Sequence, residues 1–218
     1  MASDPTILAF DTSVAHCAAA LLSGGRIVSN RHEEMTKGQA ERLMGLLAET
    51  LEDGKATWRD LDAIGVGTGP GNFTGIRISV SAARGLALGL GQPAIGVGLF
   101  DALAFGAGDP LVLSLGAPRQ HLYVQTRQGG AVSGIVLCTL DDLPDGPPGA
   151  TCIGHRSDEI ASRLGLASRP AAQPPAAAIA LLAAERLARG GDIPRPAPVY
   201  LRPADAAPPR DAPPALLP

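Results

Sequence analysis

Asp11-Thr12-Ser13 is the segment of this sequence whose residue types are best suited to chemistry. It follows an apolar, β-prone run, and it combines a carboxylate with two hydroxyls and backbone N–H groups, which suits a Mg-nucleotide phosphate. The same residues also suit an ordinary turn that satisfies its own backbone, and an isolated DTS favours that simpler structure. We therefore treat Asp11, Thr12 and Ser13 as a weak candidate for a remnant nucleotide site.

The segment TGPGNFTGIR, residues 68–77, is the second candidate for phosphate binding. Its three glycines permit positive φ angles and close approach, and Asn72 or Thr74 can cap the helix that follows. A helix N-terminus suits an anion, but the pattern G-x-x-x-x-G-K-[ST] is absent and no lysine occurs after Lys55. The segment therefore favours a structural strand-to-helix turn over a phosphate site, and the turn is formed by Gly69, Pro70 and Gly71.

Metal sites and activated nucleophiles are not indicated by the remaining residues. The four histidines show neither H-x-x-x-H nor H-E-x-x-H spacing, and no G-x-S-x-G occurs. The cysteines, at positions 17, 138 and 152, are odd in number and widely spaced, which argues against a disulfide framework and a thiolate zinc site. We expect no catalytic residue, no metal and no cofactor in this chain.

Hydrophobic periodicity predicts the elements that position these residues. Strands at 6–10, 16–22 and 26–31 form an antiparallel meander around the DTS segment. A capped helical turn is expected at 57–60, and a parallel β-α-β unit carries the glycine-rich loop. The other predicted strands are 63–67, 94–97 and 151–154, and the predicted helices are 38–52, 76–90, 157–164 and 175–189.

A faint internal repeat predicts two related lobes. Residues 7–28 lie without gaps over residues 112–133, an offset of 105, with Gly-Gly at the same place in both segments. Two-lobed phosphotransferases of the actin and sugar-kinase kind place an acidic strand end from each lobe across a cleft. The counterpart of Asp11 is Gly116. An ATP-dependent small-molecule kinase, which is the alternative function, would lack one carboxylate of the pair.

The helix behind the glycine-rich loop carries small residues about one turn apart. They allow another helix to approach closely, and the second helix belongs either to a partner or to this chain at 38–52. The residues of this face are Gly75, Ser79, Ala82 or Ala83, Leu86 and Leu90.

Composition and charge predict a chain that works in the cytoplasm and does not bind nucleic acid through a basic surface of its own. Its 18 basic and 21 acidic residues give a net charge of −3, so it has no basic stripe for nucleic-acid phosphates. No run approaches the ~20 apolar residues of a membrane span, and the first residues do not form a signal peptide. If RNA is a substrate, another subunit supplies much of the positive charge.

Four segments together resemble the bacterial TsaB (YeaZ) family of tRNA threonylcarbamoyladenosine biosynthesis proteins. They are ILAFDTS, GVGTGPGNFTGIRISVSAARGLALGL, GVGLFDALA and PVYLR, of which GPG-[SN]-FTG-x-R is the specific part. The resemblance implies an α/β, actin-like fold of two lobes, related to Hsp70, sugar kinases and RNase H. It divides the chain into a first lobe at 1–104, a smaller second lobe at 105–190 and a proline-rich tail at 191–218.

The resemblance also implies a non-catalytic subunit. Its partner would be TsaD, which transfers threonylcarbamoyl to adenosine 37 of tRNAs reading ANN codons, with TsaE completing the assembly and tRNA bound only through the complex. A homodimer is the alternative pairing. The implied interface uses the first-lobe helices, at Leu43, Leu46, Leu47, Phe73, Thr74, Gly75, Arg77, Ile78, Ser79, Ala82, Ala83 and Leu86.

Two departures from the family pattern weaken any independent catalysis. Gln39-Ala40 stands where many relatives have a histidine and a serine or threonine at the start of the first helix. Gly116-Ala117-Pro118 stands where many have Asp-Ala-Arg. The metal-binding histidines of TsaD have no counterpart in residues 38–52, which also disfavours a glycoprotease.

Overall fold

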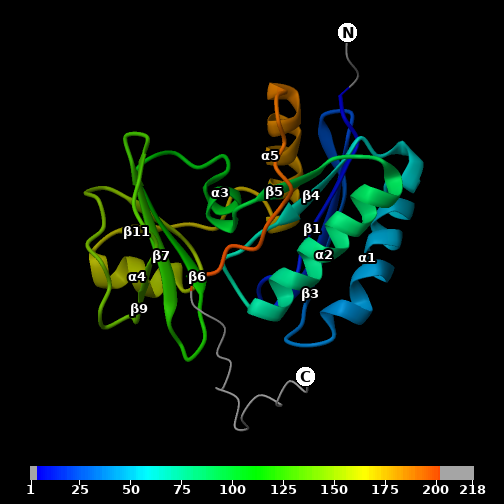
Figure 1. The fold of residues 1–218 in the computed structure, drawn as a ribbon. Helices are drawn as coiled ribbons and strands as arrows, with labels where there is room; N and C mark the ends of the chain where they lie inside the picture. The colour runs from blue at the N-terminus through cyan, green and yellow to red at the C-terminus, as the bar shows by residue number, and fades with distance from the viewer. Residues whose placement is uncertain (1–3, 202–218) are drawn as a thin grey trace, which may run out of the picture.

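Two β-sheets with helices on their faces make up the molecule in a computed structural model that describes residues 4–201 (Figure 1). The first sheet has the strand order β3-β2-β1-β4-β5. Strand β1 pairs antiparallel with β2 and parallel with β4, so the meander and the β-α-β unit share one sheet. The strands are β1 (Ile7–Asp11), β2 (His16–Ser23), β3 (Arg26–Glu34), β4 (Ala63–Gly67) and β5 (Ala94–Val97).

Helices cover both faces of the first sheet. Helices α1 (Gln39–Asp53) and α2 (Phe73–Leu90) lie on one face and α5 (Pro175–Arg189) lies on the other, with a short 3-10 turn η1 (Trp58–Asp60) before β4 (Figure 1). Leu8 and Phe10 of β1 pack towards α1 and α2, whereas Ile7 and Ala9 pack towards α5. Because both faces are buried, β1 is apolar from Ile7 to Phe10, and its only polar residue is Asp11 at its end.

The second sheet has the order β11-β10-β6-β7-β8, with β9 also paired to β7. It repeats the antiparallel and parallel pairings of the first sheet around its central strand β6. Helix α4 (Ser157–Leu164) packs on one face, and α3 (Leu99–Ala104) contacts β6 and β10. The strands are β6 (Leu111–Gly116), β7 (Leu122–Gln128), β8 (Ala131–Val132), β9 (Val136–Cys138), β10 (Thr151–Gly154) and β11 (Ala167–Ser168).

The internal repeat expected from the sequence is present in the fold. An offset of 105 residues carries β1 onto β6 and β2 onto β7. The Gly-Gly pairs at 24–25 and 129–130 end the corresponding strands, and all four residues have φ between 57° and 80°. Glycine is favoured in this left-handed region because it has no Cβ. Both hairpins therefore use the same turn.

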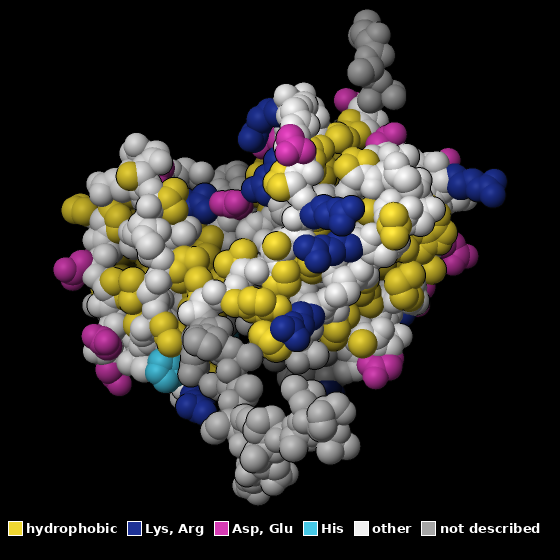
Figure 2. Space-filling model, viewed as in Figure 1, with side chains coloured by type: hydrophobic (Ala, Val, Ile, Leu, Met, Phe, Trp, Pro, Cys, Tyr) yellow, Lys and Arg dark blue, Asp and Glu magenta, His cyan; other side chains and the backbone are white. Residues whose placement is uncertain are grey.

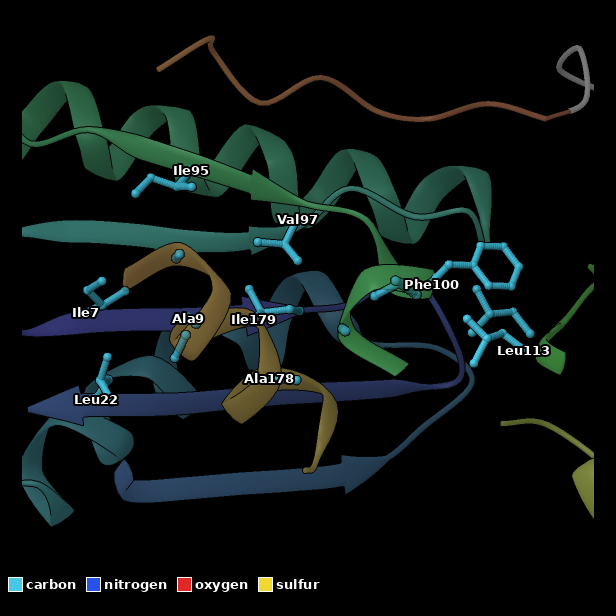
Figure 3. Close-up of a cluster of buried hydrophobic side chains, with 14 of the residues drawn as sticks. Ile7, Ala9, Leu22, Ile95, Val97, Phe100, Leu113, Ala178 and Ile179 are labelled. Atoms are coloured by element: carbon cyan, nitrogen blue, oxygen red, sulfur yellow. The ribbon is translucent and has the colours of Figure 1, made fainter. Parts of the chain in front are cut away.

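Each half of the chain contributes one helix, α3 or α5, that packs on the sheet of the other half. Helix α3 follows the first sheet in sequence and packs on the second, whereas α5 follows the second sheet and packs on β1, β2, β4 and β5. One core cluster consequently joins both sheets, with Phe100 of α3 beside Leu113 of β6 and Ile179 of α5 beside β1 (Figure 3). The division expected at residues 104 and 105 separates the strands, but α3 and α5 cross it.

Asp101 of α3 connects the two halves by ion pairs. Its Oδ1 atom lies 2.9 Å from Nη2 of Arg127 on β7, and its Oδ2 atom lies 3.0 Å from Nη2 of Arg186 on α5. Arg186 also donates a hydrogen bond to the carbonyl of Gly96 at the end of the first sheet. One carboxylate thus contacts groups from both lobes.

Most predicted elements coincide with those observed. The strands at 63–67, 94–97 and 151–154 and the helices at 157–164 and 175–189 have the expected bounds, and Thr57 and Asp60 form the expected capping box. Helix α2 begins three residues earlier than predicted because Asn72 caps it. Helix α3 was not predicted. It has only six residues, fewer than two turns, which is too short for a periodic signal.

The C-terminal segment (residues 192–201) has no helix or strand and runs back across α2. The amide of Val199 donates to the carbonyl of Thr68 at 2.9 Å, which places this segment beside the end of β4. A cavity of about 500 Å³ lies between the segment, β5 and the end of α5. The part of the predicted tail beyond residue 201 lies outside the described residues. Within the described chain, no helix is both long and apolar enough to cross a bilayer.

Candidate functional site

The DTS turn and the glycine-rich loop pack directly against each other. Asn72 donates its amide to the carbonyl of Ser13 at 2.6 Å, and Thr12 donates its hydroxyl to the carbonyl of Gly75 at 2.7 Å. A Cβ at Gly71 would overlap the Ser13 carbonyl, and one at Gly75 would overlap the Thr12 carbonyl. The two glycines are therefore required for this close contact. Backbone of the same chain fills the space next to the loop.

The N-terminus of α2 is capped by its own chain. The Oδ1 atom of Asn72 accepts hydrogen bonds from the amides of Thr74 at 2.9 Å and Gly75 at 3.0 Å. These are two of the N–H groups that an anion at a helix N-terminus would use. Gly69, Pro70 and Gly71 lie in the segment that joins β4 to α2.

Asp11 is fully buried and its carboxylate is used internally. Its Oδ2 atom accepts hydrogen bonds from the amide and the hydroxyl of Ser13 at 3.1 and 2.9 Å, and it lies 2.7 Å from Nε2 of His16. Its Oδ1 atom is buried and has no hydrogen-bond partner among residues 4–201. Thr12 and Ser13 are also fully buried. The candidate nucleotide residues are brought together, but their side chains are enclosed by the protein.

The second lobe presents glycine where the first presents Asp11. Gly116 ends β6, as Asp11 ends β1, and the ring of His155 lies against it. His155 donates its amide to the carbonyl of Ser114, and the Ser114 hydroxyl donates to the carbonyl of His155. Within residues 4–201, no group of three His, Cys, Asp or Glu side chains could hold a metal ion.

The expected partner interface divides into buried and accessible residues. Half of the predicted residues are buried inside this chain, namely Leu43, Leu46, Leu47, Gly75, Ser79 and Ala83. The other predicted residues are half-buried at Phe73, Ile78, Ala82 and Leu86 and exposed at Thr74 and Arg77. The small-residue face of α2 is turned inward because Gly75 contacts the DTS turn and Ser79 donates to the carbonyl of Gly67. Only the accessible residues can touch a partner in this conformation.

A different stripe of α2 faces solvent. Arg77, Ser81, Arg84 and Leu88 are exposed at spacings of four, three and four residues, and Leu88 is 84% exposed. Met44 of the neighbouring helix α1 is 47% exposed. Figure 2 shows apolar and Lys/Arg atoms intermixed over α2, with Asp/Glu atoms towards the edges of this face. Met44, Arg84 and Leu88 were not predicted from the sequence. They lie on the sides of α1 and α2 that face away from the predicted apolar and small-residue faces, where a helical wheel would have placed them.

Charged groups on α1 and β3 border this face. Arg42 donates to Glu33 at 2.6 and 2.8 Å and to Glu49 at 2.7 and 2.8 Å. Hydrogen bonds from Arg42 hold the pKa of both carboxyl groups below its usual range. Arg31 pairs with Glu49 and Asp53 beside them. This network is satisfied within the chain and gives the face a polar edge.

The C-terminal segment completes the face at the start of α2. The ring of Tyr200 lies 4.9 Å from that of Phe73, and the Arg77 guanidinium lies 3.9 Å from the centre of the Phe73 ring. Tyr200 also accepts a hydrogen bond from Nε of Arg77 at 2.8 Å. Tyr200 lies more than a hundred residues from Phe73 in sequence, so no local pattern could reveal the contact.

Comparisons with known proteins agree on one group of relatives. The family model described as "TsaD: tRNA N6-adenosine threonylcarbamoyltransferase" matches residues 26–143. The tRNA threonylcarbamoyladenosine biosynthesis protein TsaB of Escherichia coli is 37% identical over 102 residues, which are 46% of this chain and 43% of that protein. The matched region thus spans less than half the length of that relative.

Solved structures extend the similarity to the whole fold. YeaZ from Pseudomonas aeruginosa aligns with a TM-score of 0.71 and 27% identity, covering 90% of this chain and 100% of that one. The activator of 2-hydroxyisocaproyl-CoA dehydratase from Clostridium difficile, solved with ADPNP, aligns with a TM-score of 0.59 over 87% of this chain and 99% of that one. At 11% identity, the second likeness shows the fold alone. The two-lobed, actin-like α/β fold expected from the sequence is confirmed.

Proposed function

Because this chain belongs to the TsaB (YeaZ) family of tRNA threonylcarbamoyladenosine biosynthesis proteins, we propose that it is the non-catalytic subunit that binds and activates TsaD. In this role it supports modification of adenosine 37 in tRNAs reading ANN codons. The observation that carries the proposal is the exposed face of α1 and α2, where Met44 and Leu88 stand among small and basic side chains. Such a surface is typical of a protein interface.

The proposed interface is the accessible part of the two helices. Its centre is the stripe of Arg77, Ser81, Arg84 and Leu88 on α2, next to Met44 on α1. The buried leucines and small residues below support this face, because they hold α1 and α2 against the sheet. They act on binding through the fold and make no contact with the partner.

The strand ends support a non-catalytic role. Catalysis of phosphoryl transfer by an actin-like fold would need carboxylates that reach a nucleotide between the lobes. Here the Asp11 carboxylate is 0% exposed and accepts hydrogen bonds from Ser13, and Gly116 offers no side chain. No observation favours the small-molecule kinase that the fold alone allows.

The proposed partners follow from the same role. TsaD forms the heterodimer, TsaE joins the assembly, and tRNA is held by the complex, since this chain has 18 basic and 21 acidic residues and a net charge of −3. A homodimer through the same face competes with TsaD when the chain is alone. We place this activity in the cytoplasm, where tRNA is modified.

Co-purification provides the test. In the first experiment, the tagged full-length chain is co-expressed with TsaD and TsaE, as the wild type or as a Leu88→Glu variant. In the second, the wild type or the variant is supplied to a strain that lacks the chain's gene, and modified adenosine is measured in its tRNA. We expect wild type to retain TsaD and restore the modification, and Leu88→Glu to weaken both while keeping the wild-type melting temperature. An Ala167→Glu variant, exposed on the second lobe, is the matched control. Wild type that neither retains TsaD nor restores modification would rule the function out.

A further inference from the structure

We propose that the C-terminal segment (residues 192–201) holds Arg77 and Arg84 in position to pair with carboxylates of a partner protein, so that this face prefers an acidic partner to a second copy of the same chain. The inference rests on the proposed function, because it names the chemistry of the surface that the α2 face binds. Arg77 belongs to the interface that the family resemblance implies, whereas Arg84 and the C-terminal segment lie outside it.

The C-terminal segment contacts both arginines through the same atom of each side chain. Nε of Arg77 donates to the hydroxyl of Tyr200 at 2.8 Å, and Nε of Arg84 donates to the carbonyl of Pro196 at 2.8 Å. The Phe73 ring packs under the Arg77 guanidinium, and Val199 anchors the segment to Thr68. The Nε atom of each arginine is thereby held in place along the exposed stripe of α2.

Within the part of the chain that the structure describes, no hydrogen bond or ion pair uses the Nη atoms of Arg77 or Arg84. Within residues 4–201, both donate to neutral oxygens through Nε and to no carboxylate. Each guanidinium has five N–H donors in a planar fork, and four of them are on the Nη atoms. A fork held at Nε has fewer orientations to lose when it binds a carboxylate in a bidentate pair. The pairing therefore costs less conformational entropy than it would for two free arginines.

Charge distinguishes an acidic partner from a second copy. Helix α2 contains no Asp or Glu. A two-fold contact between two α2 helices would bring Arg77 and Arg84 of both copies together without a carboxylate from either helix. On the neighbouring elements β3 and α1, the carboxylates of Glu33 and Glu49 are already paired with Arg42. The exposed Glu41 and Glu52 belong to α1 and not to the exposed stripe of α2. Like charges at an interface oppose association, and complementary charges favour it.

The surroundings of the arginines favour a protein over a nucleic acid. Leu88 lies one turn beyond Arg84 on the stripe, and the large apolar side chains of Val199 and Leu201 are 40% and 39% exposed beside the start of α2. Phosphate backbones are contacted mainly by charged and polar groups, whereas protein interfaces combine arginine with apolar and aromatic residues. An acidic surface with apolar side chains of its own fits this face.

Charge reversal tests the inference against purified TsaD. The affinity of full-length wild type, Arg77→Glu/Arg84→Glu and the control Arg59→Glu is measured at low and high ionic strength; Arg59 is exposed on η1. We expect the double variant to bind roughly tenfold or more weakly and the control to bind normally. Binding by wild type should weaken as salt rises. Tyr200→Phe keeps the ring but removes the oxygen that holds Arg77, so we expect a smaller, several-fold loss.

A second measurement needs no partner protein. Sedimentation compares wild type alone with an equimolar mixture of wild type and Arg77→Glu/Arg84→Glu, because the variant supplies carboxylates opposite the arginines. We expect the mixture to associate more tightly than wild type alone. Equal association in the mixture, or equal TsaD binding by wild type and the double variant, would overturn the inference and leave the proposed function standing. Loss of tRNA binding by the isolated double variant, with TsaD binding intact, would assign the arginines to RNA instead.

Discussion

For Asp11, a nucleotide-binding role and a structural role require opposite exposures of the carboxylate. A carboxylate that binds Mg-nucleotide must reach solvent, whereas Asp11 is 0% exposed and lies 2.7 Å from Nε2 of His16. His16 is itself only 5% exposed, and its ring packs against that of His32. Removing the carboxylate would leave donors from Ser13 and His16 buried without an acceptor. Asp11 is thus a structural residue in this conformation.

Replacement of Asp11 by alanine should therefore destabilise the protein. We expect Asp11→Ala to lower the free energy of unfolding by about 3 kcal/mol, because a buried carboxylate that accepts three hydrogen bonds is lost. Glu52→Ala, at an exposed position of α1, should change it by less than about 0.5 kcal/mol. Urea unfolding at neutral pH measures both, and a similar small loss in the two variants would contradict the structural role of Asp11.

At the scale of single elements, the effect of a substitution in α2 depends on whether the residue lies on the inward or the outward face of the helix. Gly75 touches the Thr12 carbonyl and Ser79 reaches Gly67, so the small residues let the helix approach the first sheet. Gly85 lies on the opposite side of the same helix, where a Cβ would meet no other described part of the protein within 4 Å, apart from the neighbouring helix backbone. A side chain therefore has no room at Gly75, whereas it has room at Gly85.

Alanine substitutions at these two glycines should change stability in opposite directions. Alanine is favoured over glycine within a helix by about 0.5–1 kcal/mol, so Gly85→Ala should stabilise the protein by that amount. Gly75→Ala gains the same propensity but pushes a methyl group into the DTS turn, and we expect a net loss of about 1–3 kcal/mol. Thermal unfolding of the two variants measures the difference. Stabilisation by both would show that α2 does not pack closely on the turn.

Elements with a strong local pattern could be predicted from the sequence. Helix α5 has eight alanines or leucines before its first charged residue and a glycine after its end, and its bounds were predicted correctly. The meander and the Gly-Gly turns also follow from local preferences. The inward direction of the small-residue face could not be predicted, because the same spacing suits contact with a partner or with this chain's own sheet. The pairing of Tyr200 with Phe73 depends on tertiary structure alone.

At the scale of the whole molecule, the Asp101 ion pairs link α3 to β7 in one lobe and to α5 on the other. The Asp101 side chain is 43% exposed, and those of Arg127 and Arg186 are 21% and 34% exposed. Pairs that are partly shielded from water by neighbouring groups are worth more than fully exposed ones. The contact therefore helps to fix the orientation of the two lobes.

Neutralising Asp101 should weaken the junction between the lobes. We expect Asp101→Asn to lower the free energy of unfolding by about 1 kcal/mol and to increase amide exchange in α3, because both arginines lose their carboxylate. Asp141→Asn is the control, since Asp141 pairs with Arg163 within the second lobe and is 87% exposed. Hydrogen exchange followed by mass spectrometry distinguishes the two variants. Unchanged exchange in α3 would show that apolar packing alone sets the lobe orientation.

The exchange of α3 and α5 also has a consequence during synthesis on the ribosome. The face of the first sheet that carries Ile7 and Ala9 is covered by α5, which ends at Arg189. A nascent chain that has completed all five strands of that sheet still exposes this apolar face until nearly a hundred further residues have emerged. Exposed apolar sheet faces are prone to aggregate and to bind chaperones. The first half of this protein therefore cannot finish folding before the second half has been translated.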